Sequence, residues 1–214
     1  MKYSIIIPTM WFHIQQLNEM LTIYNSLDSV GEILIVNNDE TKRPELNFEK
    51  VRIIGNGKNI YVNPSWKLGV QESKFDNVIL ANDDITIKGE LDLLLRNISY
   101  LLREGIIVGV GENCYRKGVS LLKLKECPIN DKTRMGWGFG VFMCMKKITF
   151  LNTPIPKDFL VWYGDHILYL TNKAWSFEGV SIDTNMKGTT SKLNLSGFAA
   201  REKQAFHRYL KAGK

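Results

Sequence analysis

The chain has 214 residues, 44% of them hydrophobic and 23% charged, which are ordinary proportions for a globular protein. We expect one domain over residues 1–214, large enough to bury a core. No apolar run approaches the roughly 20 residues of a membrane helix, and the first residues lack the features of a signal peptide. Cys114, Cys127 and Cys144 are widely spaced without a CxxC pair, which argues against a disulfide framework or a zinc site. We therefore predict a cytoplasmic protein that is not stably inserted in a membrane.

The positive charge of the chain is confined to its second half. The net charge is +6. Residues 1–100 hold ten Lys/Arg and thirteen Asp/Glu, whereas residues 101–214 hold eighteen and nine. The balance is therefore −3 in the first half and +9 in the second. This asymmetry indicates an anionic partner for the second half, either nucleic acid or a membrane surface. A basic surface that is merely solvated is the alternative interpretation.

The first hundred residues alternate short apolar runs with amphipathic stretches. Apolar runs predict strands at 3–7, 32–36, 51–54 and 78–81, and helical spacing predicts helices at 15–26, 64–72 and 91–103. This order predicts an α/β fold with a Rossmann-like, mostly parallel sheet flanked by crossover helices. The carboxyl ends of such strands open on one edge of the sheet.

The second half is less regular. We predict strands at 106–110 and 139–145, a final strand within 175–182, and helices at 164–173 and 196–211. Residues 117–134 are polar and basic, and we expect an irregular loop there. The glycines of segment 136–140 indicate a backbone that comes close to a ligand, because they remove side chains from its path.

Polar residues follow the predicted strand at 78–81 directly, as Asn82-Asp83-Asp84. Carboxylates at the end of a parallel strand lie at the edge where open α/β sheets bind ligands. Two adjacent acids repel each other unless a cation lies between them, and Mg²⁺ or Mn²⁺ prefers one or two carboxylates plus phosphate oxygens. A polar turn that caps the next element is the alternative.

Five segments together resemble the GT-A-fold glycosyltransferases, particularly the family-2-like group that uses nucleotide sugars. They are Ile5-Ile-Ile-Pro-Thr9, Ile33-Leu-Ile-Val-Asn-Asn-Asp39, Asn63-Pro-Ser-Trp-Lys-Leu-Gly69, Leu80-Ala-Asn-Asp-Asp-Ile85 and Trp162-Tyr-Gly-Asp-His166. The resemblance covers roughly residues 3–180 and implies one GT-A-type domain. Residues 1–100 would hold the nucleotide-sugar donor, with UDP as the expected carrier, and residues 101–214 would hold the acceptor.

The resemblance also implies roles for the donor half. The residues implied to bind the nucleotide sugar are Pro8, Thr9, Asn38, Asp39, Asn63, Trp66, Asn82 and Asp83. Trp66 would equally suit a helix core. Asn82-Asp83-Asp84 falls where the family has its Asp-x-Asp motif, so Asp84 is implied to bind Mn²⁺ or Mg²⁺, with Asp183 or Asn185 as a further ligand. Because Asn replaces the first acid, we expect a weakly held ion shared with the substrate diphosphate.

In the acceptor half, Asp165 matches the family position of the general base that removes a proton from the acceptor hydroxyl. Capping of the helix that follows is the alternative role. Trp137, His166 and Arg134 are the candidate acceptor contacts. Trp137 would stack on a sugar or a base, or would belong to a structural turn.

For the acceptor, the basic second half and the small size of the chain resemble phage glycosyltransferases that modify hydroxymethylated pyrimidines in DNA. We therefore predict 5-hydroxymethylcytosine in DNA first, a base that must be flipped out of a duplex. A surface polysaccharide is the alternative acceptor, with the basic C-terminal helix at anionic lipid. A non-catalytic nucleic-acid-binding protein is the alternative from another class. The sequence indicates no protein partner.

Overall fold

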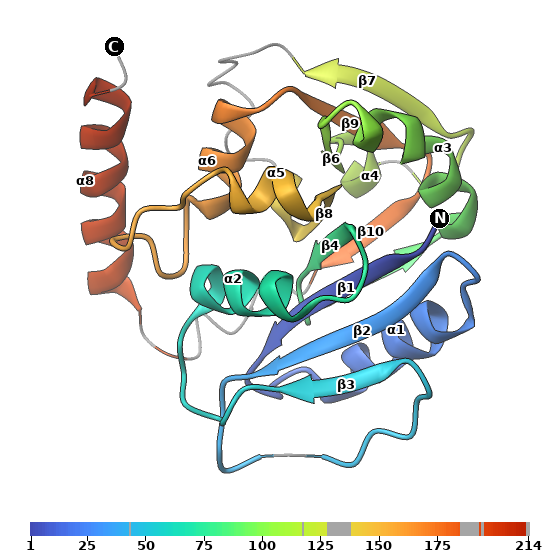
Figure 1. The fold of residues 1–214 in the computed structure, drawn as a ribbon, viewed down its shortest axis with the longest axis horizontal. Helices are drawn as coiled ribbons and strands as arrows, with labels where there is room; N and C mark the ends of the chain where they lie inside the picture. The colour runs from blue at the N-terminus through green and yellow to red at the C-terminus, as the bar shows by residue number, and fades with distance from the viewer. Residues whose placement is uncertain (43, 117, 128–137, 185–192, 194, 213–214) are drawn as a thin grey trace.

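The computed structural model describes residues 1–42, 44–116, 118–127, 138–184, 193 and 195–212. A mixed eight-stranded sheet lies at its centre (Figure 1). Across the sheet, the strands are β3 (Val51–Ile54), β2 (Val30–Asn37), β1 (Tyr3–Thr9), β4 (Asn77–Ala81), β8 (Phe142–Lys146), β6 (Ile107–Val110), β9 (Ala174–Glu178) and β7 (Lys123–Cys127). The predicted α/β fold with a mostly parallel sheet is confirmed.

Two strands of this sheet, β8 and β7, run antiparallel to their neighbours. The pairs β1–β2, β1–β4, β2–β3 and β6–β9 are parallel. Strand β8 runs antiparallel to both β4 and β6, and the edge strand β7 runs antiparallel to β9. The strand β8 therefore joins a four-stranded parallel group to a second group from the other half of the chain.

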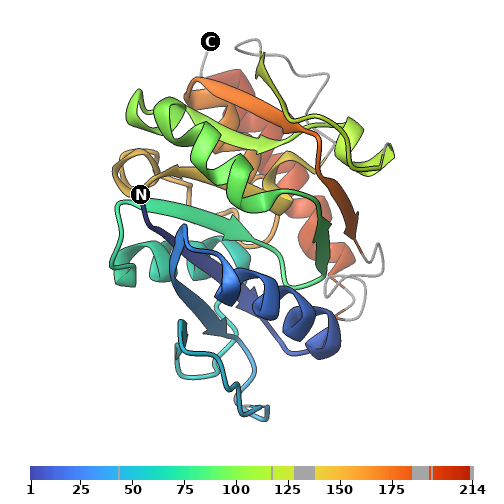
Figure 2. The same cartoon turned by 90° about the vertical axis from the view of Figure 1, so that its right-hand side faces the viewer.

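Helices cover both faces of the sheet. Apolar residues of α1 (Ile14–Ser26) and α3 (Leu91–Arg103) belong to one core cluster, and Figure 2 shows both helices on the side that faces the viewer. Residues of α2 (Val62–Glu72), α5 (Lys147–Leu151) and α6 (Gly164–Thr171) belong to the cluster on the other face. The sheet core is therefore enclosed between two helical layers.

The amphipathic spacing of α1 and α3 explains how they pack. The residues predicted to face inward are buried: Leu17, Met20, Leu21 and Tyr24 in α1, and Leu91, Leu94, Leu95, Ile98 and Leu102 in α3. They recur at intervals of three and four residues, which places them on one side of a helix. The pattern alone was therefore enough to predict both helices.

Smaller elements complete the fold. They are β5 (Ile85–Lys88) and β10 (Ser181–Thr184), which form an antiparallel pair, α4 (Asn113–Arg116), the 3₁₀ helix η2 (Phe139–Val141) and α8 (Ser196–Ala212). The three cysteines are free and buried. Within the described ranges, no helix combines the length and apolarity needed to cross a membrane.

Three predictions in the second half were wrong in detail. Part of the predicted loop at 117–134 is strand β7, whose residues at 123, 125 and 126 are exposed. Among the described residues β7 pairs with β9 alone, at the edge of the sheet. Charged side chains on an edge strand prevent pairing with another strand. The strand therefore has the polar, basic composition that is typical of a loop. The predicted strand at 139–145 starts with η2, and the segment 175–182 divides into the end of β9 and the start of β10.

The packing of α2 on the sheet yields a prediction about stability. A Cβ atom at Gly69 would overlap the side chain of Ile6, which is fully buried in β1. We expect Gly69→Ala to lower the free energy of unfolding by about 1–3 kcal/mol, despite the better helix propensity of alanine. Denaturant unfolding measures this change. Gly118→Ala is the control, because nothing lies within 4 Å of its Cβ position. Equal stability of both variants would contradict the tight contact between α2 and β1.

Candidate active site

A pocket of about 150 Å³ lies at the carboxyl ends of β1, β2 and β4. Because these strands are parallel, their ends meet at one edge of the sheet. Six of the residues predicted to bind the donor or the metal line it, namely Pro8, Thr9, Asn38, Asn82, Asp83 and Asp84. The other lining residues are Met10, Asn59, Tyr61, Val62, Val161, Leu193 and Leu195. We call this the strand-end pocket.

Hydrogen bonds between strand ends fix the floor of the strand-end pocket. The Thr9 hydroxyl donates to Asp83 Oδ2 at 2.6 Å and accepts from the backbone N–H of Trp11 at 2.9 Å. The backbone N–H of Asn38 donates to the Thr9 carbonyl at 2.9 Å. The Asn38 Oδ1 atom accepts from the N–H of Ile60 at 3.1 Å. Thr9 thus orients one carboxylate, and Asn38 joins β2 to the loop that forms the opposite wall.

Among the described residues, His13 is the positive charge that acts on the carboxyl group of Asp84. Burial of Asp84 raises its pKa, and the positive charge of His13 only partly opposes this, so that the net pKa lies above the ordinary value. A bound cation would favour the ionised form and reverse the shift. Asp83 is 8% exposed and Asp84 follows it directly, so two carboxylates are available at the same edge.

These two carboxylates suit a shared ion better than a permanent metal site. Within the described ranges, no group of three or more His, Cys, Asp or Glu side chains is placed to hold a metal. Two carboxylates completed by phosphate oxygens of a substrate are, however, an ordinary set of ligands for Mg²⁺ or Mn²⁺. The residues therefore fit an ion that arrives with a phosphate ligand.

Asp39 and Asp183 do not line the strand-end pocket. The Asp39 Oδ1 atom accepts hydrogen bonds from the N–H and the hydroxyl of Thr41, at 3.0 and 2.6 Å, and these bonds hold the pKa of Asp39 below its ordinary value. Asp183 is exposed in β10, where it pairs with Thr86 of β5. Thr86 is two residues from Asp84, so Asp183 lies on the strand beside the Asp84 segment, and its role as a further metal ligand stays a prediction. Asn185, the alternative ligand, lies outside the described residues.

Asn63 and Trp66 lie on α2 and serve the packing of that helix. The Asn63 side-chain amide donates to the carbonyl oxygens of Phe159 and Trp162, both at 3.1 Å. Trp66 is 4% exposed within the core cluster between α2 and the sheet. Neither side chain lines the strand-end pocket, and the donor contacts predicted for them stay predictions. The core role, which was the alternative for Trp66, is the one observed.

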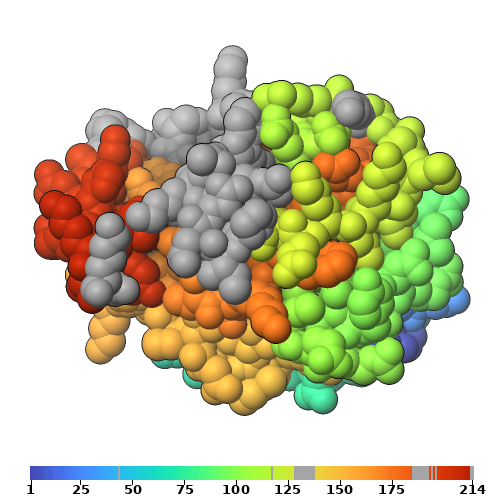
Figure 3. All heavy atoms as spheres, turned by 90° about the horizontal axis from the view of Figure 1, so that it is seen from above, coloured from blue at the N-terminus to red at the C-terminus, as the bar shows by residue number. Residues whose placement is uncertain are grey.

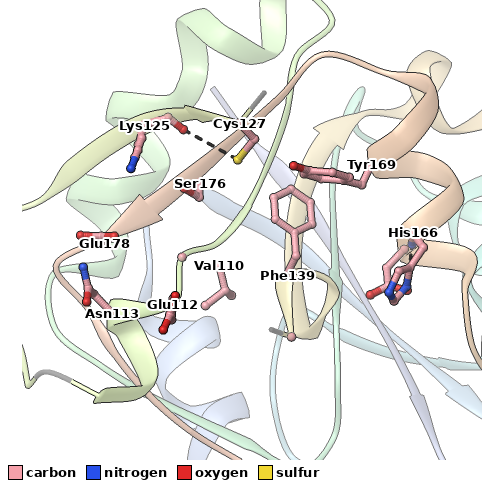
Figure 4. A pocket seen from close by; sticks show the side chains of 13 residues that line it. Val110, Glu112, Asn113, Lys125, Cys127, Phe139, His166, Tyr169, Ser176 and Glu178 are labelled. Atoms are coloured by element: carbon pink, nitrogen blue, oxygen red, sulfur yellow. Dashed lines mark hydrogen bonds and ion pairs between the residues drawn. The ribbon is translucent and has the colours of Figure 1, made fainter. Parts of the chain in front are cut away.

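A second pocket, of about 220 Å³, lies between β6, α4, β7, β9, η2 and α6. Its lining includes Asp165 and His166 from α6, together with Val110, Gly111, Glu112, Asn113, Lys125, Cys127, Gly138, Phe139, Tyr169, Ser176 and Glu178. In Figure 4 the side chains of Glu112, Asn113 and Glu178 lie together, across from the rings of Phe139 and Tyr169. We call this the α6 pocket. It combines an aromatic wall with a wall of hydrogen-bonding groups.

Asp165 is paired with the residue that follows it. Its Oδ1 atom lies 2.8 Å from His166 Nδ1 and accepts from the His166 backbone N–H at 2.9 Å. Burial raises the pKa of Asp165, but the hydrogen bonds and the charge of His166 lower it more, so the net pKa lies below the ordinary value. The carboxylate is therefore ionised at neutral pH and able to accept a proton.

The helix η2 contacts residues of both pockets: Phe139 lines the α6 pocket, and Val141 contacts the end of β4. The backbone N–H of Asn82, in the strand-end pocket, donates to the Val141 carbonyl at 3.0 Å. The neighbouring Gly140 packs so closely against Asp165 that a Cβ atom there would overlap its side chain. The end of β4 and the carboxylate of Asp165 are thus separated by two residues of η2.

Two predicted acceptor residues, Arg134 and Trp137, lie outside the described residues. Several residues of the α6 pocket were not predicted from the sequence, among them Glu112, Phe139, Tyr169 and Glu178. Glu112 comes two residues after β6 and Glu178 is the last residue of β9, so polar residues at strand ends, the signal that located Asp83, were present here as well.

The fold is an α/β architecture with a mostly parallel sheet between two layers of helices. No model of a protein family and no curated protein matches the sequence. Among solved structures, the fold is similar to S. aureus TarS residues 1–349, with a TM-score of 0.58 and 13% identity over 82% of this chain and 58% of that one. TarS 1–349 in complex with UDP-GlcNAc has a TM-score of 0.56 at 13% identity, and the complex with UDP one of 0.57 at 12%. These matches cover 82% of this chain and 56% and 57% of those chains. The chain therefore spans little more than half of the TarS fragment.

The Asp165–His166 pair makes stability depend on pH in a defined direction. Because the folded pKa of Asp165 is lowered, its stabilising contribution is present above the ordinary carboxyl pKa of about 4 and is lost as the pH falls through the folded value. We expect Asp165→Asn to lower the melting temperature at pH 7. The difference from the unmodified protein should shrink progressively below about pH 4. Thermal unfolding between pH 7 and pH 3 measures it. A difference that is constant with pH would show that the pair does not stabilise the folded state.

Proposed function

We propose that this protein is a glycosyltransferase that moves a sugar from a nucleotide donor, with UDP as the carrier, to an acceptor hydroxyl. The observation that carries the proposal is the pair of pockets on either side of η2. One has strand-end carboxylates suited to a metal–diphosphate, and the other has an ionised Asp165. The GT-A-type fold supports it, as do the complexes of TarS with UDP and UDP-GlcNAc.

The donor would bind in the strand-end pocket with Mn²⁺ or Mg²⁺. Asp83 and Asp84 line this pocket, and a cation between these carboxylates and a diphosphate would remove the repulsion between them. Asp84 would bind the ion directly, and Asp83, held by Thr9, would orient the ribose or the sugar. When bound, the ion stabilises the negative charge that grows on the leaving diphosphate.

Asp165 would act as the general base. The acceptor hydroxyl transfers its proton to the Asp165 carboxylate, while its oxygen forms a bond to the anomeric carbon of the sugar. The bond between that carbon and the diphosphate oxygen breaks, and the electron pair leaves with the nucleotide. The contact of Gly140 with Asp165 and the hydrogen bond of Val141 with Asn82 support this role, because they join the base to the donor side.

For the acceptor, we propose 5-hydroxymethylcytosine in DNA as the first candidate. Four basic residues of α8 are exposed, and they offer contacts to phosphates: Arg201, Lys203, Arg208 and Lys211. The aromatic wall of the α6 pocket suits stacking of a flipped base, and carboxylates such as Glu112 and Glu178 can accept from a cytosine amino group.

A sugar hydroxyl of a polysaccharide is the second candidate. It is favoured by the charge of the α6 pocket, whose described lining holds Glu112, Asp165 and Glu178 against Lys125 and His166. Carboxylates accept hydrogen bonds from sugar hydroxyls but repel the phosphates of a DNA strand. The two candidates therefore depend on different surfaces, the pocket lining and the exposed face of α8.

One experiment distinguishes these proposals. The protein is incubated with Mn²⁺, a panel of nucleotide sugars and DNA containing 5-hydroxymethylcytosine, and the DNA is then measured by mass spectrometry. A gain of one hexose or pentose would establish the reaction, the donor and the acceptor together. Hydrolysis of a donor without modification of the DNA would support the glycosyltransferase activity but exclude this acceptor, and glycans would be tested next. Binding of DNA with neither signal would indicate a non-catalytic nucleic-acid-binding protein.

The first functional prediction concerns Asp165. We expect Asp165→Asn to reduce transfer by about 10²–10⁴-fold with little change in donor affinity, because the amide cannot accept the proton. Steady-state transfer assays and calorimetric titration with UDP measure the two effects. Asp158→Asn, an exposed Asp in the segment before α6, is the control and should leave both unchanged. Retained turnover in Asp165→Asn would remove this residue from the mechanism.

The second functional prediction concerns the metal. We expect Asp84→Asn to lower kcat/KM by about 100-fold or more and to raise the Mn²⁺ concentration needed for half-maximal activity. The same substitution at Asp76, which is exposed before the opposite end of β4, serves as the control. Titration of UDP binding with and without Mn²⁺ gives a readout that does not need turnover. Identical metal dependence in Asp84→Asn and Asp76→Asn would exclude Asp84 as a ligand.

A further inference from the structure

The C-terminal helix α8 lies beside the segment that leads into α6, away from the central sheet (Figure 1). In Figure 3 its red surface adjoins the orange surface of that segment. The buried residues of α8 form a separate small cluster with Phe159 and Ile167. Neither of the two large clusters that enclose the sheet includes a residue of α8. The helix therefore contributes to the surroundings of α6 more than to the sheet core.

Glu202 of α8 binds three consecutive backbone N–H groups. Its carboxylate accepts from Leu160 at 3.0 Å, from Val161 at 3.1 Å and from Trp162 at 2.8 Å. Glu202 is 2% exposed, although acidic residues are rarely buried so fully. The three amides belong to an irregular segment, and no strand partner satisfies them. A carboxylate that accepts several N–H bonds fixes such a segment strongly.

The ring of Phe206 in α8 contacts the rings of Tyr163 and His166. Its ring stacks on Tyr163, with 4.4 Å between centroids and 18° between planes, and lies 5.6 Å from the ring of His166. Tyr163 has a φ angle of 64°, in the left-handed region that a tyrosine rarely adopts. Such a conformation costs about 1–3 kcal/mol and persists only where its surroundings enforce it. Phe206 supplies part of that enforcement.

The turn at Tyr163 determines where α6 begins. Gly164 is the first residue of the helix and Asp165 the second, so the direction of the turn sets the position of the Asp165 carboxylate. The side chain of Asn63 binds the same segment from α2, through Phe159 and Trp162. The segment before Asp165 is thus held from two sides.

The first turn of α8 contacts the other pocket. The ring of Phe198 lies 5.3 Å from that of Tyr61, which lines the strand-end pocket. Leu195, directly before the helix, lines the same pocket and accepts the N–H of Ala199 at 3.0 Å. One helix therefore contacts the walls of the strand-end pocket and the turn that carries Asp165.

We propose that α8 is a positioning element of the active site, in which Glu202 and Phe206 hold residues 160–163 so that Asp165 meets the acceptor beside the donor. This inference rests on the proposed function. Glu202 and Phe206 touch neither substrate and act through the turn that precedes Asp165.

The test uses Glu202→Gln and Phe206→Leu in the full chain, with Gln204→Ala on the exposed face of α8 as the control. A displaced base slows the chemical step more than it weakens donor binding. We therefore expect kcat to fall at least about tenfold in both variants, with the KM for the donor changed less than about threefold. Hydrogen exchange of the amides of residues 160–162 should become faster in Glu202→Gln. The control should match the unmodified protein in all three quantities.

A second readout does not require turnover. The chain has three histidines, so the ring ¹⁵N resonances of His166 can be assigned by its replacement. Its pairing with Asp165 should weaken in Phe206→Leu, which would shift these resonances and their pH titration. Faster exchange at 160–162 with unchanged kcat and unchanged His166 resonances would overturn the proposal and leave α8 a purely structural helix. A shifted His166 spectrum in a protein without transferase activity would support the positioning role and refute the proposed reaction instead.

Discussion

Parallel pairing of β1 with both β2 and β4 is the constraint on which the rest of the structure depends. In this pairing Ile5 lies opposite Ile33 on one side and Ile79 on the other, so three buried strands run in one direction at nearly the same level. Parallel neighbours need crossover connections, and the chain supplies α1 and α2, one on each face. All three strands must then end at the same edge. The polar residues that follow them can only meet there, which is why Thr9, Asn38 and Asp83 share hydrogen bonds or a common wall.

The antiparallel strand β8 has a complementary role. It enters the sheet beside β4 from the direction of the strand-end pocket, so the residues before it, in η2, lie against the end of β4. Glycine at position 140 lets α6 approach this backbone directly. A reversal of one strand thus places a carboxylate from residue 165 next to the site built by the first 84 residues. Residues that are far apart in the sequence, Asp165 and the end of β4, are thus brought close by tertiary packing and not by a local sequence motif.

The two pockets are acidic although the chain as a whole is basic. The chain has a net charge of +6, yet the described linings of the two pockets carry five carboxylates, namely Asp83, Asp84, Glu112, Asp165 and Glu178. The basic residues of α8 are exposed, and its one acidic residue, Glu202, is turned inward onto backbone amides. Of these acids Asp83 and Glu202 are buried, and a buried carboxylate is stable only with donors or cations around it. The donors to Glu202 are the three backbone N–H groups of residues 160–162, shortly before Asp165.

The α/β class, the ends of the strands in the first half and the buried faces of α1 and α3 were predictable from the sequence, because apolar periodicity reports directly on which side of an element is buried. The sequence also located the carboxylates at 83 and 84, since their position after a strand is a local pattern, whereas Asp165 came from the resemblance to a family motif. Only the tertiary structure decided that Trp66 and Asn63 serve packing, that residues 123–127 form an edge strand, and that Glu202 binds the turn before Asp165. Each of these depends on partners 40 or more residues away in the chain. A charged residue in a basic helix or a polar residue at a helix start has the same local pattern whether it faces water or another segment, and only packing distinguishes the two.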